Sequence, residues 1–239
     1  MNIALIGYGR MGKEIEAAAK ERNHEIPLII DIDNSNELNE QNLKNIDVAI
    51  EFTIPESAFN NIMTCFNANV PVVSGTTGWL DNYETVKSYC DSQGKTFFYA
   101  PNYSIGVNIL FKVNAYLAKI MNNFSNYEVG IEETHHKYKL DSPSGTAIKL
   151  ANDIIQRIDR KKLWEEDTDL NDETINIHAI REDNIPGIHT ITYDSDIDSI
   201  SLTHSAKSRK GFALGAVMAA EFTKDKSGLY SMDDLLQID

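Results

Sequence analysis

Three glycines near the amino terminus constrain the fold of this chain more than any other feature. Gly7, Gly9 and Gly12 form the pattern Gly-x-Gly-x-x-Gly between an apolar run at residues 2–6 and a helical pattern at residues 11–20. In a strand–turn–helix unit the first glycine permits the tight turn, the second lets the backbone approach a pyrophosphate, and the third lets helix and strand pack closely. The free N–H groups and positive dipole end of the helix favour the same anion. Any strand-to-helix turn can use glycines, so the motif predicts dinucleotide binding only together with its context.

The first hundred residues repeat this alternation of short apolar runs and helical patterns. Residues 34–45 are polar and rich in asparagine, which indicates a loop or a frayed helix. Parallel strands need crossovers, so the pattern predicts a Rossmann-type α/β fold, with a doubly wound parallel sheet covered by helices on both faces. Strands are predicted at residues 2–6, 25–30, 47–52, 70–74 and 96–100, and helices at 11–20, from Pro55 onwards and at 80–93.

After residue 101 the pattern changes, which indicates a second domain. Three alternating runs in this part favour a mixed or antiparallel sheet. The last helix, at residues 212–222, is apolar enough to pack on the first domain. We therefore predict a dinucleotide-binding domain at residues 1–103 and 210–239, with an α+β domain at 104–209 inserted into it. The inserted elements are predicted as helices at 107–121 and 145–158 and strands at 127–133, 174–181, 188–193 and 197–204.

Charge and composition argue against several classes of partner. The chain has 22 Lys and Arg against 36 Asp and Glu, a formal net charge of −14. Such a field repels nucleic-acid phosphates and anionic membranes, so neither is expected as a partner. No run approaches the roughly 18 apolar residues of a membrane helix and no leader precedes the first strand, so a cytoplasmic location is predicted. Cys65 and Cys90 stand apart, which argues against a disulfide framework or a zinc site.

An acidic residue after the second strand predicts the choice of cofactor. Asp31 lies 19 residues after Gly12, where a carboxylate can accept both ribose hydroxyls of a dinucleotide. A carboxylate there repels a 2′-phosphate, and no arginine follows it, so NADH is expected to be preferred and NADPH to remain possible. Arg10 and Lys13 could weaken the preference. The alternative that Asp31 is a solvated loop acid stays open.

Three further turns follow the predicted strands of the first domain. Open α/β sheets bind ligands at the carboxyl ends of their strands, so these turns are expected near a nicotinamide. As ordinary turns they would need no ligand. They consist of Phe52 and Thr53, of Gly75, Thr76 and Thr77, and of Ala100, Pro101, Asn102 and Tyr103.

The segment from residue 133 to residue 147 gathers basic side chains in an otherwise acidic chain. His135, His136 and Lys139 stand within five residues of one another, and Ser144, Gly145 and Thr146 follow at a predicted helix start. The first N–H groups of that helix make an anion site of carboxylate size, and Lys139 can supply the countercharge. Histidine can transfer a proton near neutral pH. Neighbouring histidines lack the usual spacing of metal ligands, so no metal site is predicted. A surface histidine and a plain helix cap remain the alternative reading.

These residues resemble a known family. The pattern E-x-H-H-x-x-K-x-D-x-P-S-G-T-A from Glu133 to Ala147, with GRMG, GTTG and PNYSIGVN, closely resembles the bacterial dihydrodipicolinate reductases, now described as 4-hydroxy-tetrahydrodipicolinate reductases. The resemblance implies a reductase of the diaminopimelate route to lysine. Hydride would pass from the nicotinamide to C4 of a cyclic imine dicarboxylate, and the hydroxyl would leave as water.

The resemblance also implies roles for individual residues. His135 would be the proton donor, Lys139 the second catalytic acid and His136 a substrate contact, and Gly145 and Thr146 would hold one carboxylate. Ser144 is predicted to join this substrate-binding site through its hydroxyl at the helix start. The second domain would bind substrate and build a homotetramer through its sheet. Ile54 stands where some relatives carry arginine, which puts a cofactor contact from that side chain in doubt. Cofactor contacts would fall on Gly7, Tyr8, Gly9, Arg10, Met11, Asp31, Gly75, Thr76, Thr77, Ala100, Pro101, Asn102 and Tyr103, and the strand-end position adds Phe52 and Thr53.

Two other functions stay open at this point. The chain could be a catalytically silent dinucleotide sensor or scaffold, since fold does not fix function. It could also be another two-domain nicotinamide reductase of small acids. The reductase hypothesis depends on one spatial expectation, that residues 135–146 form a positively charged cradle facing the nicotinamide held by the first domain.

Overall fold

The computed structural model describes residues 1–168 and 172–237. The chain divides into two compact units. The first unit contains Met1–Ile105 and Arg209–Asp239, and the second contains Gly106–Ser208. None of the helices in the described part of the chain is long and apolar enough to cross a membrane.

The first unit is built on a parallel sheet of six strands in the order β11-β5-β4-β3-β1-β2. This arrangement confirms the predicted doubly wound sheet. The prediction lacked β11, because a three-residue strand carries no readable alternation. The strands are β1 (Asn2–Ile6), β2 (Glu25–Ile30), β3 (Val48–Glu51), β4 (Val72–Ser74), β5 (Thr96–Tyr99) and β11 (Gly228–Tyr230).

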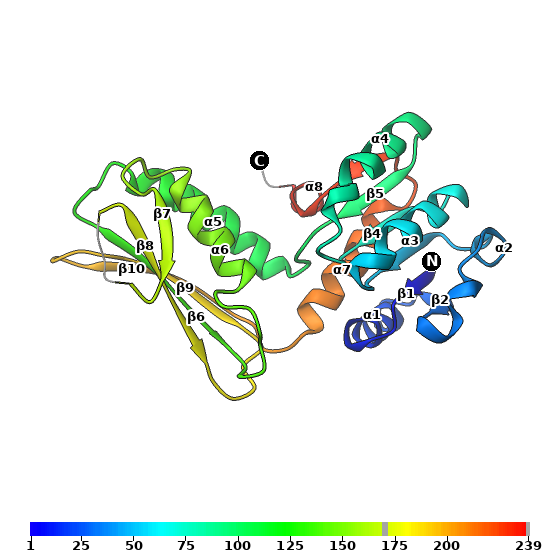
Figure 1. Cartoon of the computed structure of the whole chain (residues 1–239), viewed down its shortest axis with the longest axis horizontal. Helices are drawn as coiled ribbons and strands as arrows, with labels where there is room; N and C mark the ends of the chain where they lie inside the picture. Colours follow the sequence, from blue (N-terminus) through cyan, green and yellow to red (C-terminus); the bar gives the residue numbers. More distant parts are fainter. Residues whose placement is uncertain (169–171, 238–239) are drawn as a thin grey trace. The chain divides into compact units, whose positions relative to one another are not determined.

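Helices cover both faces of this sheet, as Figure 1 shows. Successive strand residues face opposite sides, so Ile3 and Leu5 of β1 pack with α1 (Arg10–Glu21) and α7 (Lys210–Thr223), whereas Ala4 and Ile6 pack with α3 (Pro55–Asn67) and α4 (Tyr83–Gln93). The shorter helices of the unit are η1 (Ile32–Glu37), α2 (Glu40–Leu43), η2 (Leu80–Asn82) and α8 (Met232–Leu236).

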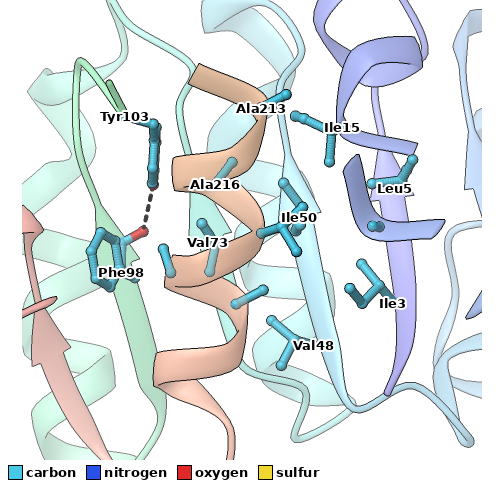
Figure 2. Packing of buried hydrophobic residues seen from close by; sticks show 14 of the residues in the cluster. Ile3, Leu5, Ile15, Val48, Ile50, Val73, Phe98, Tyr103, Ala213 and Ala216 are labelled. Atoms are coloured by element: carbon cyan, nitrogen blue, oxygen red, sulfur yellow. Dashed lines mark hydrogen bonds between the residues drawn. The ribbon is translucent and has the colours of Figure 1, made fainter. Parts of the chain in front are cut away.

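The last long helix packs on the first unit, as its apolar composition predicted. Ala213 of α7 lies beside Ile15 of α1, and Ala216 lies near Ile50 and Val73 of the sheet (Figure 2). A glycine lets α7 come close to the turn after β5: a Cβ at Gly215 would meet the Tyr103 carbonyl oxygen at 1.8 Å. The second unit is therefore an insertion in the sequence, bounded on both sides by segments of the first.

The second unit contains a mixed sheet of five strands in the order β10-β9-β6-β8-β7. Parallel pairs join β6 to β8 and β7 to β8, and antiparallel pairs join β9 to β6 and β10 to β9. The helices α5 (Ile105–Met121) and α6 (Gly145–Ile155) cover one face (Figure 1). The strands are β6 (Glu128–His135), β7 (Leu163–Glu166), β8 (Thr174–Arg181), β9 (Ile188–Asp194) and β10 (Ser199–Ser205). The edge strand β7 was not predicted, because its four residues are largely exposed and show no apolar pattern.

Candidate active site

The glycine turn after β1 has the geometry that its sequence predicted. Gly7 has φ +96°, and a Cβ there would meet the Phe52 carbonyl oxygen at 2.0 Å. A Cβ at Gly12 would meet the Gly7 carbonyl oxygen at 2.3 Å, so this glycine is required for helix α1 to pack on the turn. A Cβ at Gly9, in contrast, would meet no described atom within 4 Å. The first and third glycines serve packing, and the second leaves open space where a ligand could approach the backbone.

Helix α1 begins next to this open space. Gly9 is its N-cap, and within the described residues no side chain caps the helix and no acidic residue lies in its first turn. Its first N–H groups therefore have neither an intrahelical acceptor nor a side-chain cap. An uncapped helix start beside an unhindered glycine is suited to bind a phosphate group. Arg10, an exposed residue, is the first of the helix.

A cavity of about 410 Å³ connects the glycine turn with the end of β2. Asp31 follows β2 directly and lines this cavity with Gly7, Tyr8 and Gly9. The Asp31 N–H donates to Oδ1 of Asn34 at 2.7 Å, which fixes the backbone at the start of η1. The structure thus brings Asp31 and the glycine turn into one cavity, at the carboxyl ends of the strands.

A second cavity of about 280 Å³ lies beside the turns that follow β3 and β4. Its lining includes Met11, Thr53, Ile54, Thr76 and Thr77. Ile54 lines both cavities and is more than half exposed. Its apolar side chain therefore lies at the candidate site but cannot form an ion pair with a ligand there. A further cavity of about 360 Å³, lined by residues such as Asp47 and Lys95, lies at the opposite, amino-terminal ends of the strands.

A buried carboxylate joins the turns after β3 and β4. Glu51 has no exposed surface, and its oxygens accept hydrogen bonds from Ser74 Oγ at 2.7 Å, from Thr76 Oγ1 at 2.9 Å and from the Thr53 N–H at 3.2 Å. The Thr53 hydroxyl also donates to Glu51. Glu51 was not predicted as a site residue, because in the sequence it reads as one more residue of an apolar strand.

The turn after β5 contributes mainly backbone to this edge of the sheet. The Tyr103 side chain is buried in the core, and its hydroxyl donates to the Ser74 carbonyl oxygen at 2.7 Å (Figure 2 shows its longer contact with Phe98). Ala100 is also buried, whereas Pro101 is exposed and Asn102 partly exposed. The side chain of Tyr103 therefore serves packing, and only its backbone could contact a cofactor.

In the second unit, strand register assembles a charged cluster around Glu133. Glu133 and His135 continue the alternation of Val129 and Ile131, so they point to the face that the helices cover. His189 of β9 lies opposite Glu133, and Arg181 of β8 lies opposite His135. Three neighbouring strands thus bring these four side chains together.

The Glu133 carboxylate contacts all of them. Its Oε2 lies 2.9 Å from Nδ1 of His135 and 3.6 Å from Nε2 of His189, while Oε1 accepts from the Arg181 guanidinium at 3.0 Å and from the Ser144 N–H at 3.0 Å. The His135 contact is close in distance but off hydrogen-bond alignment.

Burial and hydrogen bonds act on the ionisation of this cluster in opposite directions. Burial alone would raise the pKa of Glu133, but its close contacts with His135 and Ser144 outweigh burial and lower that pKa to about 2. Burial, reinforced by the charge of His135, lowers the pKa of His189 to about 3. At neutral pH Glu133 is therefore ionised and His189 is neutral.

Ser144 belongs to this cluster and caps α6. Its hydroxyl accepts from the Ala147 N–H at 3.2 Å and lies 3.1 Å from Nε2 of His189. The side chain is buried, so it supports the helix start, and its hydroxyl is already engaged with protein groups. Gly145 is exposed and Thr146 partly exposed, and they supply the first N–H groups of α6.

His136 and Lys139 lie outside the buried cluster. His136 is the first residue after β6 and is partly exposed, and its N–H donates to the Ile185 carbonyl oxygen at 2.8 Å. Lys139 contacts both carboxylate oxygens of Asp141, at 2.8 and 2.9 Å. Burial opposes ionisation of Asp141, but the Lys139 contact lowers its pKa. His135 and His136 thus take different environments, because the strand ends between them.

Glu133, His135 and His189 also offer three ligand atoms within 4.8 Å of one another. Two of these atoms, on His135 and Glu133, are buried without a hydrogen-bond partner among the described residues. The Arg181 guanidinium already places a positive charge 3.0 Å from the same carboxylate, which disfavours a cation there. The cluster fits a neutral network of one carboxylate and one guanidinium. The absence of a metal stays a prediction.

Comparisons with known proteins cover almost the whole chain. Residues 1–103 match the family model "Dihydrodipicolinate reductase, N-terminus", and residues 106–236 match "Dihydrodipicolinate reductase, C-terminus". The chain is 52% identical over 236 residues to the 4-hydroxy-tetrahydrodipicolinate reductase of Christiangramia forsetii, covering 99% of this chain and 98% of that protein.

The chain belongs to the dihydrodipicolinate reductase family. The reductase of Archaeoglobus fulgidus is 39% identical over 80% of this chain and 76% of its own length. Among solved structures, the dipicolinate-bound dihydrodipicolinate reductase from Paenisporosarcina sp. TG-14 matches 97% of both chains with a TM-score of 0.79 at 24% identity. This likeness confirms the fold class.

Proposed function

We propose that this chain reduces 4-hydroxy-tetrahydrodipicolinate to tetrahydrodipicolinate, a step of the diaminopimelate route to lysine. One observation carries the proposal. In a chain of this family, the buried carboxylate of Glu133 contacts both His135 and the Ser144 N–H, directly before Gly145 and Thr146 at the start of α6. A silent sensor would have no need of this arrangement.

The first unit fits a nicotinamide dinucleotide. The open space at Gly9, the uncapped start of α1 and the cavity shared with Asp31 are the features that such a ligand requires. When bound, the cofactor would supply the hydride. The N–H groups of α1 would hold its pyrophosphate, and the Asp31 carboxylate would accept the ribose hydroxyls. A carboxylate repels a 2′-phosphate, so we propose a preference for NADH.

The second unit would bind and protonate the substrate. The N–H groups of Gly145 and Thr146, at the positive end of α6, would hold a substrate carboxylate. His136 would contact the substrate, and Lys139 would offset its negative charge once it parts from Asp141. His135 would donate a proton to the ring and Lys139 would act as the second acid. The expectation that this cradle faces the nicotinamide stays a prediction.

We also propose a homotetramer that is assembled through the sheet of the second unit. The helices α5 and α6 pack on one face of that sheet, and hydroxyl pairs such as Thr190–Thr203 and Thr192–Ser201 lie on the other. A cytoplasmic location stays a prediction, supported by two free cysteines that are both buried.

The test follows the loss of NADH absorbance with freshly prepared 4-hydroxy-tetrahydrodipicolinate. We expect turnover, with a higher kcat/KM for NADH than for NADPH. His135→Gln should lower kcat about 10²- to 10⁴-fold, the range that general acid catalysis contributes, with little change in the KM for NADH. No turnover by the wild type would refute the proposed function. Equal or better efficiency with NADPH would refute only the role of Asp31.

A further inference from the structure

Glu133 contacts both parts of the proposed substrate site, the His135 ring and the start of α6. It is fully buried, and its two oxygens contact groups from β6, β8, β9 and the start of α6. Such a carboxylate needs partners for both oxygens, since an unpaired buried charge is strongly destabilising. Arg181 supplies the opposite charge and the Ser144 N–H a directional hydrogen bond, both to Oε1, whereas Oε2 faces Nδ1 of His135 at 2.9 Å.

We propose that Glu133 is a positioning residue, which holds the imidazole of His135 in one orientation and one tautomer and at the same time fixes the start of α6. The proposal rests on the proposed function only in taking His135 as the proton donor. It assigns Glu133 a task in the reaction without contact to the substrate.

The tautomer follows from the short distance between the two groups. Oε2 of the ionised Glu133 carboxylate lies 2.9 Å from Nδ1 of His135, where a ring lone pair would face the carboxylate's negative charge, so the neutral ring carries its hydrogen on Nδ1. The other ring nitrogen, Nε2, is then the one that gains and loses a proton. It lies on the side of Gly187, where a Cβ would stand 2.9 Å away. Gly187 therefore keeps the reactive side of the ring clear of a side chain.

The second task concerns the anion-binding helix start. Oε1 of Glu133 accepts from the Ser144 N–H, and Ser144 caps α6 through its hydroxyl. The N–H groups that would bind a substrate carboxylate belong to the next two residues. A displacement of Glu133 would therefore move the proton donor and the anion site together, so their separation is set by one side chain.

The charges around the network keep Glu133 ionised. Arg181 faces it from β8, and His135 from its own strand. His189 faces Glu133 from β9 as a neutral ring. The centres of the His189 and His135 rings are 5.0 Å apart, and the two rings lie edge to face. The charges of Asp141 and Lys139 act from the loop before α6, and His204 acts on His189 from β10. Glu133 thus serves as an acceptor throughout the working pH range.

Glu133→Gln provides a directional test. The amide oxygen is needed by the N–H donors of Ser144 and Arg181, so the amide NH₂ must face His135. The neutral ring must then present a lone pair at Nδ1 and carry its hydrogen on Nε2. Nitrogen NMR of histidine-labelled protein should show the Nδ1–H tautomer of His135 in the wild type and the Nε2–H tautomer in Glu133→Gln.

Kinetics provide the second readout. We expect Glu133→Gln to lower kcat about 10- to 100-fold and to raise the KM for substrate, with the KM for NADH unchanged. Glu133→Asp keeps the acceptor charge and should recover part of kcat. The matched control is Glu128→Gln, at the other end of β6, where the carboxylate pairs with Lys161 at 2.6 Å; it should keep kcat within about twofold and His135 in its Nδ1–H form.

The outcomes separate the two proposals. An unchanged His135 tautomer in folded Glu133→Gln overturns the positioning role, whether or not the enzyme turns over. Equal losses of kcat in Glu133→Gln and Glu128→Gln would also overturn it, because they would indicate a general loss of stability. If neither the wild type nor Glu133→Gln turns over, but the His135 tautomer still switches from Nδ1–H in the wild type to Nε2–H in the variant, the positioning role is supported and the reductase assignment is refuted.

Discussion

At the residue scale, the second unit keeps two ionisation states down to a lower pH than the unfolded chain would. Glu133 is buried and ionised, with a pKa lowered to about 2, and His189 is buried and neutral, with a pKa lowered to about 3. Between its lowered pKa and its ordinary pKa, each group binds fewer protons in the folded chain than in the unfolded chain. Folding stability must therefore rise with pH across these two ranges.

The expected pH dependence can be divided between the two groups. The contribution of His189 is fully present above about pH 6.5 and is lost as the pH falls toward about 3, whereas that of Glu133 is lost between about 4.5 and about 2. Between pH 6.5 and 5, His189→Gln should reduce the slope of the unfolding free energy by up to about 1.4 kcal/mol per pH unit, the value for one proton. Urea unfolding at several pH values measures this. Identical slopes in the wild type and the variant would contradict the buried neutral state of His189.

At the element scale, periodicity identified most strands and helices, but not the contacts between their ends. The residues after β3 and β4 read as separate turns in the sequence. In the structure Glu51 ties them together through Thr53, Ser74 and Thr76. Short elements such as β7 and β11 escaped prediction because they are held by backbone pairing with a neighbouring strand, which leaves no side-chain pattern.

Replacing Glu51 should loosen both turns at once. In Glu51→Gln, the amide NH₂ cannot accept the hydroxyl donors that a carboxylate oxygen accepts, so we expect a loss of about 1–3 kcal/mol of stability and weaker NADH binding. Ser74→Ala, which removes one of these donors, is the milder comparison. Urea unfolding and NADH fluorescence titration measure the two effects. A folded Glu51→Gln protein with wild-type affinity for NADH would show that the turns hold their shape without this carboxylate.

At the scale of the whole molecule, each unit has its own core and its own part of the chemistry. The parallel sheet carries the dinucleotide features, and the mixed sheet carries the cluster around Glu133. The face of the mixed sheet that points away from the helices carries hydroxyl pairs such as Thr190–Thr203 and Thr192–Ser201. This face is where the proposed tetramer would form.

Sedimentation velocity tests the assembly directly. We expect a species with the mass of four 26.8 kDa chains. Thr192→Arg places a long cation on the face away from the helices, so it should shift the distribution to smaller species with little change in secondary structure. A wild type that sediments as a single chain at micromolar concentration would refute the tetramer, and an unaffected Thr192→Arg tetramer would place the interface elsewhere.

The sequence by itself determined the fold class, the glycine turn and the position of the residues with chemical character, because apolar periodicity and glycine sterics act over a few neighbouring residues. Those local rules identified His135 and the helix start at Ser144, Gly145 and Thr146. Only the tertiary structure decided that Glu133, Arg181 and His189 surround His135, that Glu51 joins two turns, and that the side chains of Tyr103 and Ser144 are engaged inside the protein. The reason is strand register: residues as far apart in the chain as Glu133 and His189 meet only when neighbouring strands pair, and no local pattern encodes which residues will lie opposite one another.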